Sequence, residues 1–251
     1  MNEVLTRHFA AMGARLAVHG TPLGMPSIDV VSDTFVIRYP GEGRSVGAEV
    51  IAVDRPGHHL LLLVRDGDVK SKFLCGHDER HWFVAAVPEA ARGVTNVATA
   101  KLALQPTVVH DAVRRRRPKD RFRRRNPAYV RQGEWFFVPS PDLEPPAAEV
   151  VRNEPLTRGR GKAHVLERAH RKGGTSEWVN GNGGRMNDLQ FRKLKPNGGR
   201  GWRRMILDPE LYATGAVRHP DHATIVLRGW HRVVMNTEQG ARAMAHVAFL
   251  D

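Results

Sequence analysis

Two groups of side chains in this sequence have the types and spacing needed for chemistry, one rich in histidine and one rich in arginine. In the histidine group, residues 218–222 read Arg-His-Pro-Asp-His, and another histidine follows Trp230. Imidazoles beside a carboxylate can act as general acid and base in phosphodiester cleavage, or can bind a divalent metal. The predicted catalytic residues are His219, Asp221, His222 and His231, and His164 and His170 could join them from a neighbouring strand. The alternative is an ordinary polar turn with a capping aspartate.

A second histidine pair, His77 and His81, encloses Asp78, Glu79 and Arg80. On a helix this i,i+4 spacing would place both imidazoles on one face, as in zinc-binding helices. The order of the five residues differs from the usual zinc-protease string, and the flanking residues favour strands. We therefore expect a loop in which these polar groups satisfy one another. The single cysteine, Cys75, precedes His77, but no third residue that would orient a thiol nucleophile can be identified.

The arginine group fills residues 114–125, where one aspartate interrupts a run of like charges. An unpaired buried guanidinium costs several kcal/mol, so this run is expected at the surface. Arginine presents a planar fork of donors that matches two phosphate oxygens at once. The run therefore predicts contact with the backbone of a nucleic acid.

Further basic residues are interleaved with glycine and tryptophan in residues 158–204, a composition typical of segments that coat a phosphate chain. Solvated surface loops are the alternative for this stretch. Aromatic residues at 135–137 could stack on bases, or could be packed in the core on both faces of a strand. The predicted nucleic-acid-binding residues are Arg114, Arg115, Arg116, Arg117, Lys119, Arg121, Arg123, Arg124, Arg125, Arg131, Trp135, Arg158, Arg160, Lys162, Arg171, Lys172, Arg200, Trp202, Arg203 and Arg204.

The composition supports a folded protein with an anionic partner. The chain has 251 residues, 41% of them hydrophobic, and a formal net charge of +13. Such a charge favours nucleic acid or an anionic surface and says nothing about the fold. One cysteine allows no internal disulfide, which fits a reducing compartment. The N-terminus has no signal-peptide pattern and no apolar run could cross a bilayer, so we expect a cytoplasmic protein without a membrane partner.

The elements that must position these residues predict an α+β fold with two antiparallel-sheet lobes. The N-terminal lobe, residues 1–105, has a helix over 3–18, strands between 28 and 75, and a helix over 93–104. Residues 106–126 form a connector, in which Thr107 caps a helix through Val113 that runs into the arginines. The C-terminal lobe, residues 127–251, has one strand over 130–138, glycine-rich basic loops with little regular structure over 158–204, and strands beyond 213 with a turn at Arg228-Gly229.

These observations favour a sequence-tolerant nucleic-acid-binding protein that has no cofactor. RNA is favoured over DNA, because glycine-rich basic loops suit irregular single strands and no helix-turn-helix or Cys-His finger pattern is present. The partners would then be RNA and, in a ribonucleoprotein, other proteins. Two alternatives stay open. One is a histidine-dependent nuclease or phosphoesterase, which could use a divalent metal, and the other is a scaffold that docks on an acidic protein.

Overall fold

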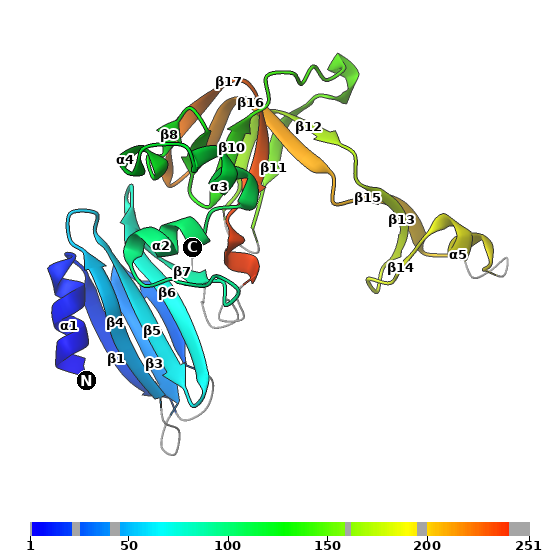
Figure 1. Cartoon of the computed structure of the whole chain (residues 1–251). Helices are drawn as coiled ribbons and strands as arrows, with labels where there is room; N and C mark the ends of the chain where they lie inside the picture. The colour runs from blue at the N-terminus through cyan, green and yellow to red at the C-terminus, as the bar shows by residue number, and fades with distance from the viewer. Residues whose placement is uncertain (1, 22–25, 41–45, 159–161, 195–199, 241–251) are drawn as a thin grey trace.

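The computed structural model describes residues 2–21, 26–40, 46–158, 162–194 and 200–240. Most of the described chain is strand, arranged in several sheets, with a few short helices (Figure 1). The expected mixture of helices and antiparallel sheets is present, but the fold is mainly β. No described helix is both long enough and apolar enough to cross a membrane.

The chain begins with a helix and a small sheet. α1 (Asn2–Ala11) is followed by β1 (Arg15–Thr21), β2 (Ser27–Val31) and β3 (Thr34–Pro40), which pair in the order β1-β3-β2. The predicted helix over 3–18 was too long. Gly13 adopts a left-handed conformation with φ of 88°, which ends the helix, and Leu16 lies in β1. β1 and β3 are parallel, a pairing that the prediction of antiparallel sheets did not include.

A four-stranded antiparallel meander follows, made of β4 (Val46–Asp54), β5 (His59–Asp66), β6 (Val69–Asp78) and β7 (His81–Val87). The predicted hairpin at Asp66-Gly67-Asp68 joins β5 to β6. β5 is buried on both faces. Leu60 and Leu62 pack into the core shared with α1 and the first sheet, whereas Leu61 packs into a second core under α2 (Val97–Ala103). This double burial explains the run of consecutive leucines.

Two short helices connect this part of the chain to the next sheet. α3 (Thr107–Val113) lies after Pro106 and ends at Val113, as predicted, but Thr107 is its first residue and not its cap, and no side chain caps it. The helix buries Val109 and Val113 against Tyr129 and Phe136. α4 (Pro118–Arg121) is a single turn that starts at a proline. The arginine run therefore spans the end of α3, α4 and the residues up to β8 (Arg125–Asn126).

The largest sheet has seven strands in the order β11-β12-β16-β17-β10-β9-β8. Its remaining strands are β9 (Tyr129–Gln132), β10 (Trp135–Pro139), β11 (Val151–Leu156), β12 (His164–Lys172), β16 (Glu210–His219) and β17 (His222–Met235). Two predictions were wrong here. Residues 130–138 form a hairpin that turns at Gly133, with φ of 56°, and β17 continues through Arg228-Gly229, where the register shifts at an irregularity.

An arm projects from the seven-stranded sheet (Figure 1). It consists of β13 (Thr175–Asn180), β14 (Arg185–Met186), α5 (Asp188–Arg192) and β15 (Trp202–Leu207), with the strands in the order β14-β13-β15. The expectation of little regular structure over 158–204 was therefore wrong for this segment and for β12. Glycines lie in the turns between these strands, and the strands themselves carry β-branched and aromatic residues.

The described chain is not clearly divided into two lobes at residues 105 and 127. Two 3₁₀ turns complete it, Ala147–Glu149 and Thr237–Gly240. The second turn returns to the N-terminal sheets. The amide of Ala86 in β7 donates to the Glu238 carboxylate at 3.2 Å, and the amide of Thr237 donates to the Leu104 carbonyl at 3.1 Å. These contacts tie the last strand of the large sheet to the four-stranded meander.

Candidate nucleic-acid surface and histidine cluster

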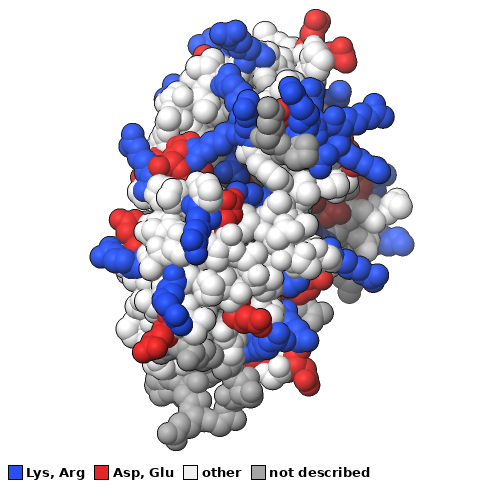
Figure 2. Space-filling model, turned by 60° about the vertical axis from the view of Figure 1, so that its left-hand side comes forward, with Lys and Arg blue, Asp and Glu red and all other residues white. Residues whose placement is uncertain are grey.

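The first part of the arginine run is exposed. Arg114, Arg115, Arg116 and Arg117 all lie at the surface beyond α3. The single acid of the run, Asp120, pairs with two side chains, Nε of Arg117 and Nε of Arg123, each at 3.4 Å. Lys and Arg side chains gather over the upper half of the face in Figure 2, at the height of the seven-stranded sheet in Figure 1. We call Arg114–Arg117 the exposed arginine patch.

Other arginines of the run make hydrogen bonds within the protein. Nε of Arg121 donates to the Arg116 carbonyl at 2.9 Å, and its Nη2 donates to the Arg114 carbonyl at 3.1 Å, so Arg121 closes the turn between α3 and α4. Arg125 is exposed, but its Nη2 donates to the Val226 carbonyl in β17 at 3.2 Å. Lys119 belongs to α4.

Arg124 and Arg131 hold the meander against the seven-stranded sheet. Arg124 pairs with both Asp78 and Glu79 at the tip of the β6–β7 hairpin, and Nη2 of Arg131 lies 3.1 Å from Oδ2 of Asp78. Burial, reinforced by the nearby charge of Arg131, lowers the pKa of Arg124 to about 10. Both guanidiniums are paired with carboxylates of the protein itself, and their contact with phosphate stays a prediction.

Two of the other predicted binding residues are also internal, and a third, Lys162, is exposed but paired within the protein. Trp135 is only 9% exposed and lies in the core of the large sheet, because both faces of residues 135–137 are packed. Arg158 forms a 3.0 Å ion pair with the buried Glu238. Lys162 pairs with Asp221 at 2.9 Å. These positions were predicted from charge and aromatic type, which do not distinguish an internal partner from a ligand.

The remaining basic residues lie near or on the arm. Arg171 is exposed and pairs with Glu154, and Lys172, Arg200 and Arg203 are exposed. Arg204 is exposed and contacts Ser176 and Asp188. Trp202 is partly buried in β15. Arg160 lies outside the described residues.

The arm is held together by an aromatic pair. The indole of Trp178 stacks on Phe191 with ring centroids 3.6 Å apart and planes 2° from parallel, and its Nε1 donates to Asp188 at 2.7 Å. Leu189 and Ile206 are exposed on the same small module. The stack leaves Trp178 on β13 partly exposed, so the arm joins an aromatic side chain with several cations.

Three histidines come together at one end of the large sheet. His164 is the first residue of β12, His219 is the last of β16 and His222 is the first of β17. The tight β16–β17 hairpin pairs His219 with His222, and β12 lies beside β16, so one ring nitrogen of each histidine lies within 4.8 Å of the others. The rings of His164 and His219 are stacked with centroids 4.2 Å apart. We call these three residues the histidine cluster.

The tip of the β6–β7 hairpin orients the cluster. Nδ1 of His222 lies 3.2 Å from Oε2 of Glu79, which also accepts the amide of Ala223. Because the carboxylate accepts a hydrogen bond from the Nδ1–H group, the lone pair of His222 is on Nε2. Glu79 was noticed in the sequence only as part of the His77–His81 pattern, and no local signal predicts that it meets a histidine 143 positions away.

The two other members differ in their surroundings. Nε2 of His164 is buried and has no hydrogen-bond partner among the described residues. Nδ1 of His219 accepts the amide of Asp221 at 3.1 Å, and its Nε2 lies 3.3 Å from the Lys162 carbonyl. A methyl group on Gly133 would lie 3.2 Å from Nε2 of His222 and 3.6 Å from Nε2 of His164, so these two nitrogens face the same space beside the β9–β10 turn.

Burial keeps the cluster neutral. It lowers the pKa of His164 to about 3, and charge on either neighbouring ring would lower it further. The pKa values of His219 and His222 are also lowered, mainly by burial. All three imidazoles are therefore neutral near pH 7, which suits metal binding or a general base, and the lone pair of His219 is the one that already accepts the Asp221 amide.

Not all of the predicted catalytic residues join the cluster. His231 was predicted to belong to one catalytic group with His222, and a turn was predicted between them at Arg228-Gly229. The strand continues instead, so His231 lies further along β17, opposite Ala213, and its Nδ1 contacts the Gly229 carbonyl. His170 lies at the far end of β12, near Trp230. Asp221 is adjacent to the cluster, and its hydrogen bond from Lys162 lowers its pKa.

The His77–His81 segment is a hairpin turn. His77 and His81 belong to two antiparallel strands, and the ring of His77 packs edge-on to Trp82, so the two imidazoles do not share a helix face. Asp78 and Glu79 are satisfied by distant arginines, not by Arg80 as expected. Cys75 is buried and its pKa is raised by burial, which does not suit a nucleophile.

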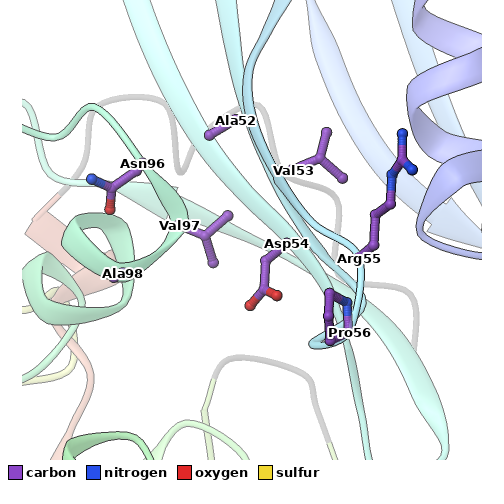
Figure 3. Close-up of a pocket in the computed structure, with 8 residues that line it drawn as sticks. All are labelled: Ala52, Val53, Asp54, Arg55, Pro56, Asn96, Val97 and Ala98. Carbon is purple, nitrogen blue, oxygen red and sulfur yellow. The ribbon is translucent and has the colours of Figure 1, made fainter. Parts of the chain in front are cut away.

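A depression of about 510 Å³ lies between the β4–β5 turn and α2 (Figure 3). Asp54 points into it, whereas Arg55 points away toward α1. The polar groups that line it have structural partners, since Asp54 binds the Gly57 amide and lies 3.8 Å from Lys101, and Asn96 caps α2. This depression therefore has no convergent set of groups for chemistry.

Comparisons of the chain with family models, curated proteins and solved structures found no match. The function must therefore be argued from the geometry of the arginine patch, the arm and the histidine cluster.

Proposed function

We propose that the protein binds nucleic acid without strong sequence preference, with RNA favoured over DNA. The observation that carries the proposal is the exposed arginine patch. No ion pair is described for Arg114, Arg115 or Arg116 within the part of the chain that the structure covers, and Asp120 is shared by Arg117 and Arg123. A dense cationic surface that its own fold does not neutralise is suited to a phosphate chain.

The arm supports the same proposal. It carries Arg200, Arg203 and Lys172 on its exposed surface or at its base, together with the partly exposed Trp178. Cations beside an aromatic ring suit a single strand, because phosphates pair with the cations while a base stacks on the ring. A groove-fitting helix is not needed for this mode of binding.

The proposal predicts a steep salt dependence. With six or more phosphates contacted, the affinity for a 20-nucleotide single-stranded RNA should fall by about a thousandfold between about 50 and 200 mM salt. Replacing Arg114, Arg115 and Arg116 together by glutamine should weaken binding at low salt and reduce the slope of log affinity against log salt by about 2. Fluorescence anisotropy measures both quantities.

A matched control removes three charges elsewhere. Arg7, Arg55 and Lys70 are exposed residues of the N-terminal part of the chain, and their joint replacement by glutamine should change the slope much less. A flat salt response of the wild type, or an equal loss in both triple variants, would contradict the proposal. Binding of an acidic protein that survives nuclease treatment would instead support the scaffold alternative.

A second function, phosphodiester hydrolysis, is favoured by the convergence of His164, His219 and His222 beside Arg124. Labelled RNA and DNA incubated with and without EDTA should then be cleaved by the wild type and by His231→Ala, but not by His222→Ala at unchanged nucleic-acid affinity. Absence of cleavage on every substrate would leave the binding function alone.

A further inference from the structure

We propose that His164, His219 and His222 together bind one transition-metal ion, Zn²⁺, with a fourth coordination position left to water or to a substrate oxygen. The inference goes beyond nucleic-acid binding and does not depend on it, because its test measures the metal directly. It stands on four features of the cluster: the convergence of the nitrogens, an unpartnered buried nitrogen, a carboxylate behind one ring, and a glycine beside the nitrogens.

The donor set selects the kind of metal. Three imidazole nitrogens suit Zn²⁺ and its neighbours in the first transition series, whereas Mg²⁺ and Ca²⁺ prefer oxygen ligands. Among the described residues, the group contains these three histidines and no fourth His, Cys, Asp or Glu. Three protein ligands with one open position is the arrangement of catalytic zinc sites, whereas structural sites have four.

The buried nitrogen of His164 indicates a ligand. Its Nε2 lacks a hydrogen-bond partner in the described structure although the residue is only 2% exposed. Burying a polar atom without a partner costs about 1–3 kcal/mol, and such atoms are uncommon in folded proteins. Coordination of a metal by this lone pair would satisfy it.

The carboxylate of Glu79 fixes His222 as a ligand. A metal-binding histidine commonly donates its other ring N–H to a carboxylate, which sets the tautomer and the ring orientation. Glu79 makes this contact at 3.2 Å and is itself held by Arg124 and by the Ala223 amide. Its backbone φ of 51° places it at a strained turn, at the position where the hairpin reaches the cluster.

Gly133 leaves the space in front of the nitrogens open. The Nε2 atoms of His164 and His222 both approach the place where a side chain at position 133 would begin. His219 completes the set by a turn of its ring. This turn breaks the 3.1 Å hydrogen bond that Nδ1 accepts from the Asp221 amide and the 3.3 Å contact of Nε2 with the Lys162 carbonyl. Glu79 pairs with Arg124 and Asp221 pairs with Lys162, so these carboxylates offset two cations near the cluster.

The test begins with the full chain stripped of metal by a chelator and then equilibrated with Zn²⁺. We expect one Zn²⁺ per chain by elemental analysis, and no displacement by millimolar Mg²⁺. In a competition titration against a chromogenic chelator, His219→Ala and His222→Ala should each weaken Zn²⁺ binding at least tenfold, and His231→Ala, from the same strand β17, should not. Co²⁺ should give the intense visible absorption of a four-coordinate site in the wild type and in His231→Ala, but not in His219→Ala or His222→Ala.

A histidine variant could fail to fold, so Gly133→Ala and Glu79→Gln test the site with all three histidines in place. Gly133→Ala places a methyl group against the ligand nitrogens, whereas Gly67→Ala, at a similar φ of 58°, meets no atom within 4 Å. Both substitutions strain the backbone, but only Gly133→Ala should weaken Zn²⁺ binding. Glu79→Gln should weaken it by about 10–100-fold. Substoichiometric Zn²⁺ in the wild type, or equal affinities for the two glycine variants, would overturn the proposal.

Discussion

The arginines of this protein show how one residue type takes several roles. Arg115 is exposed and has no ion pair in the described structure, Arg121 caps backbone carbonyls, and Arg124 is paired with two carboxylates. Each role follows from what lies within reach of the guanidinium. A binding surface should therefore be assigned only to the arginines without an internal partner, which are concentrated at Arg114–Arg116.

His59 should make the free energy of unfolding depend on pH. Burial lowers its pKa from 6.5 to about 4, and the charge of Lys101 lowers it further. A lowered histidine pKa means that the unfolded chain binds the proton more readily. The stability contribution is therefore complete above about pH 6.5 and is lost as the pH falls through 4, by up to about 3 kcal/mol.

Replacing His59 by glutamine should remove this part of the pH dependence. Urea unfolding at pH 7, 5.5 and 4 gives the free energy of unfolding for both proteins, and the other histidines contribute equally to each. The variant should be less stable at pH 7, since it loses the edge-on contact with Phe83, but should lose less on acidification. Parallel pH profiles would contradict the assignment.

At the scale of elements, the arm is a separate unit in its packing. None of its residues belongs to the buried cores of the described chain, and it is held by its own ladder and by the Trp178–Phe191 stack. Thr175 and Leu207 are paired at its base, so the chain enters and leaves at one point. An element of this kind can be removed without opening a core.

We expect that replacing residues 175–207 by a short glycine-serine linker changes the free energy of unfolding of the remainder by less than about 1 kcal/mol, as urea unfolding would show. The same deletion should lower RNA affinity, because it removes Arg200, Arg203 and Trp178. A large loss of global stability on deletion would show that the arm supports the sheet.

Trp178→Ala should loosen the arm selectively, which hydrogen exchange would report as lost protection in β13 and β15.

At the scale of the whole molecule, the two larger sheets are joined by charge. The β6–β7 hairpin places Asp78 and Glu79 against Arg124 and Arg131, and the same hairpin orients His222. We call these ion pairs between the β6–β7 hairpin and the large sheet the joint. The joint couples the position of the meander to the geometry of the histidine cluster. Its ion pairs are partly shielded from water, so they are screened less by salt than surface pairs are.

Replacing Asp78 by alanine should therefore destabilise the protein by about 2 kcal/mol, because it removes the carboxylate that Arg131 contacts. The matched control is Glu49→Ala, which breaks the exposed pair with Arg65 and should cost less than about 1 kcal/mol. Denaturant unfolding measures both changes. Equal effects would mean that the joint contributes no more than a surface ion pair.

Local pattern in the sequence was enough for much of the secondary structure. The apolar runs over 28–75 became the strands β2 to β6, and α3 began directly after Pro106, because β-branched runs, turn residues and prolines act over a few positions. The errors were local too. Gly13, Gly133 and Gly229 each adopt a positive φ, and that conformation decided whether the chain ended a helix, turned or bulged.

The sites depend on pairings that no local pattern contains. The sequence alone determined the basic character of the chain and the abundance of histidine. Only the tertiary structure decided that His164 lies beside His219 and His222. It also decided that Glu79 contacts His222, and that Trp135 and Arg158 are internal. The physical reason is that strand order and register bring together residues far apart in the chain, and burial then determines which charges are neutralised and which remain open to a ligand.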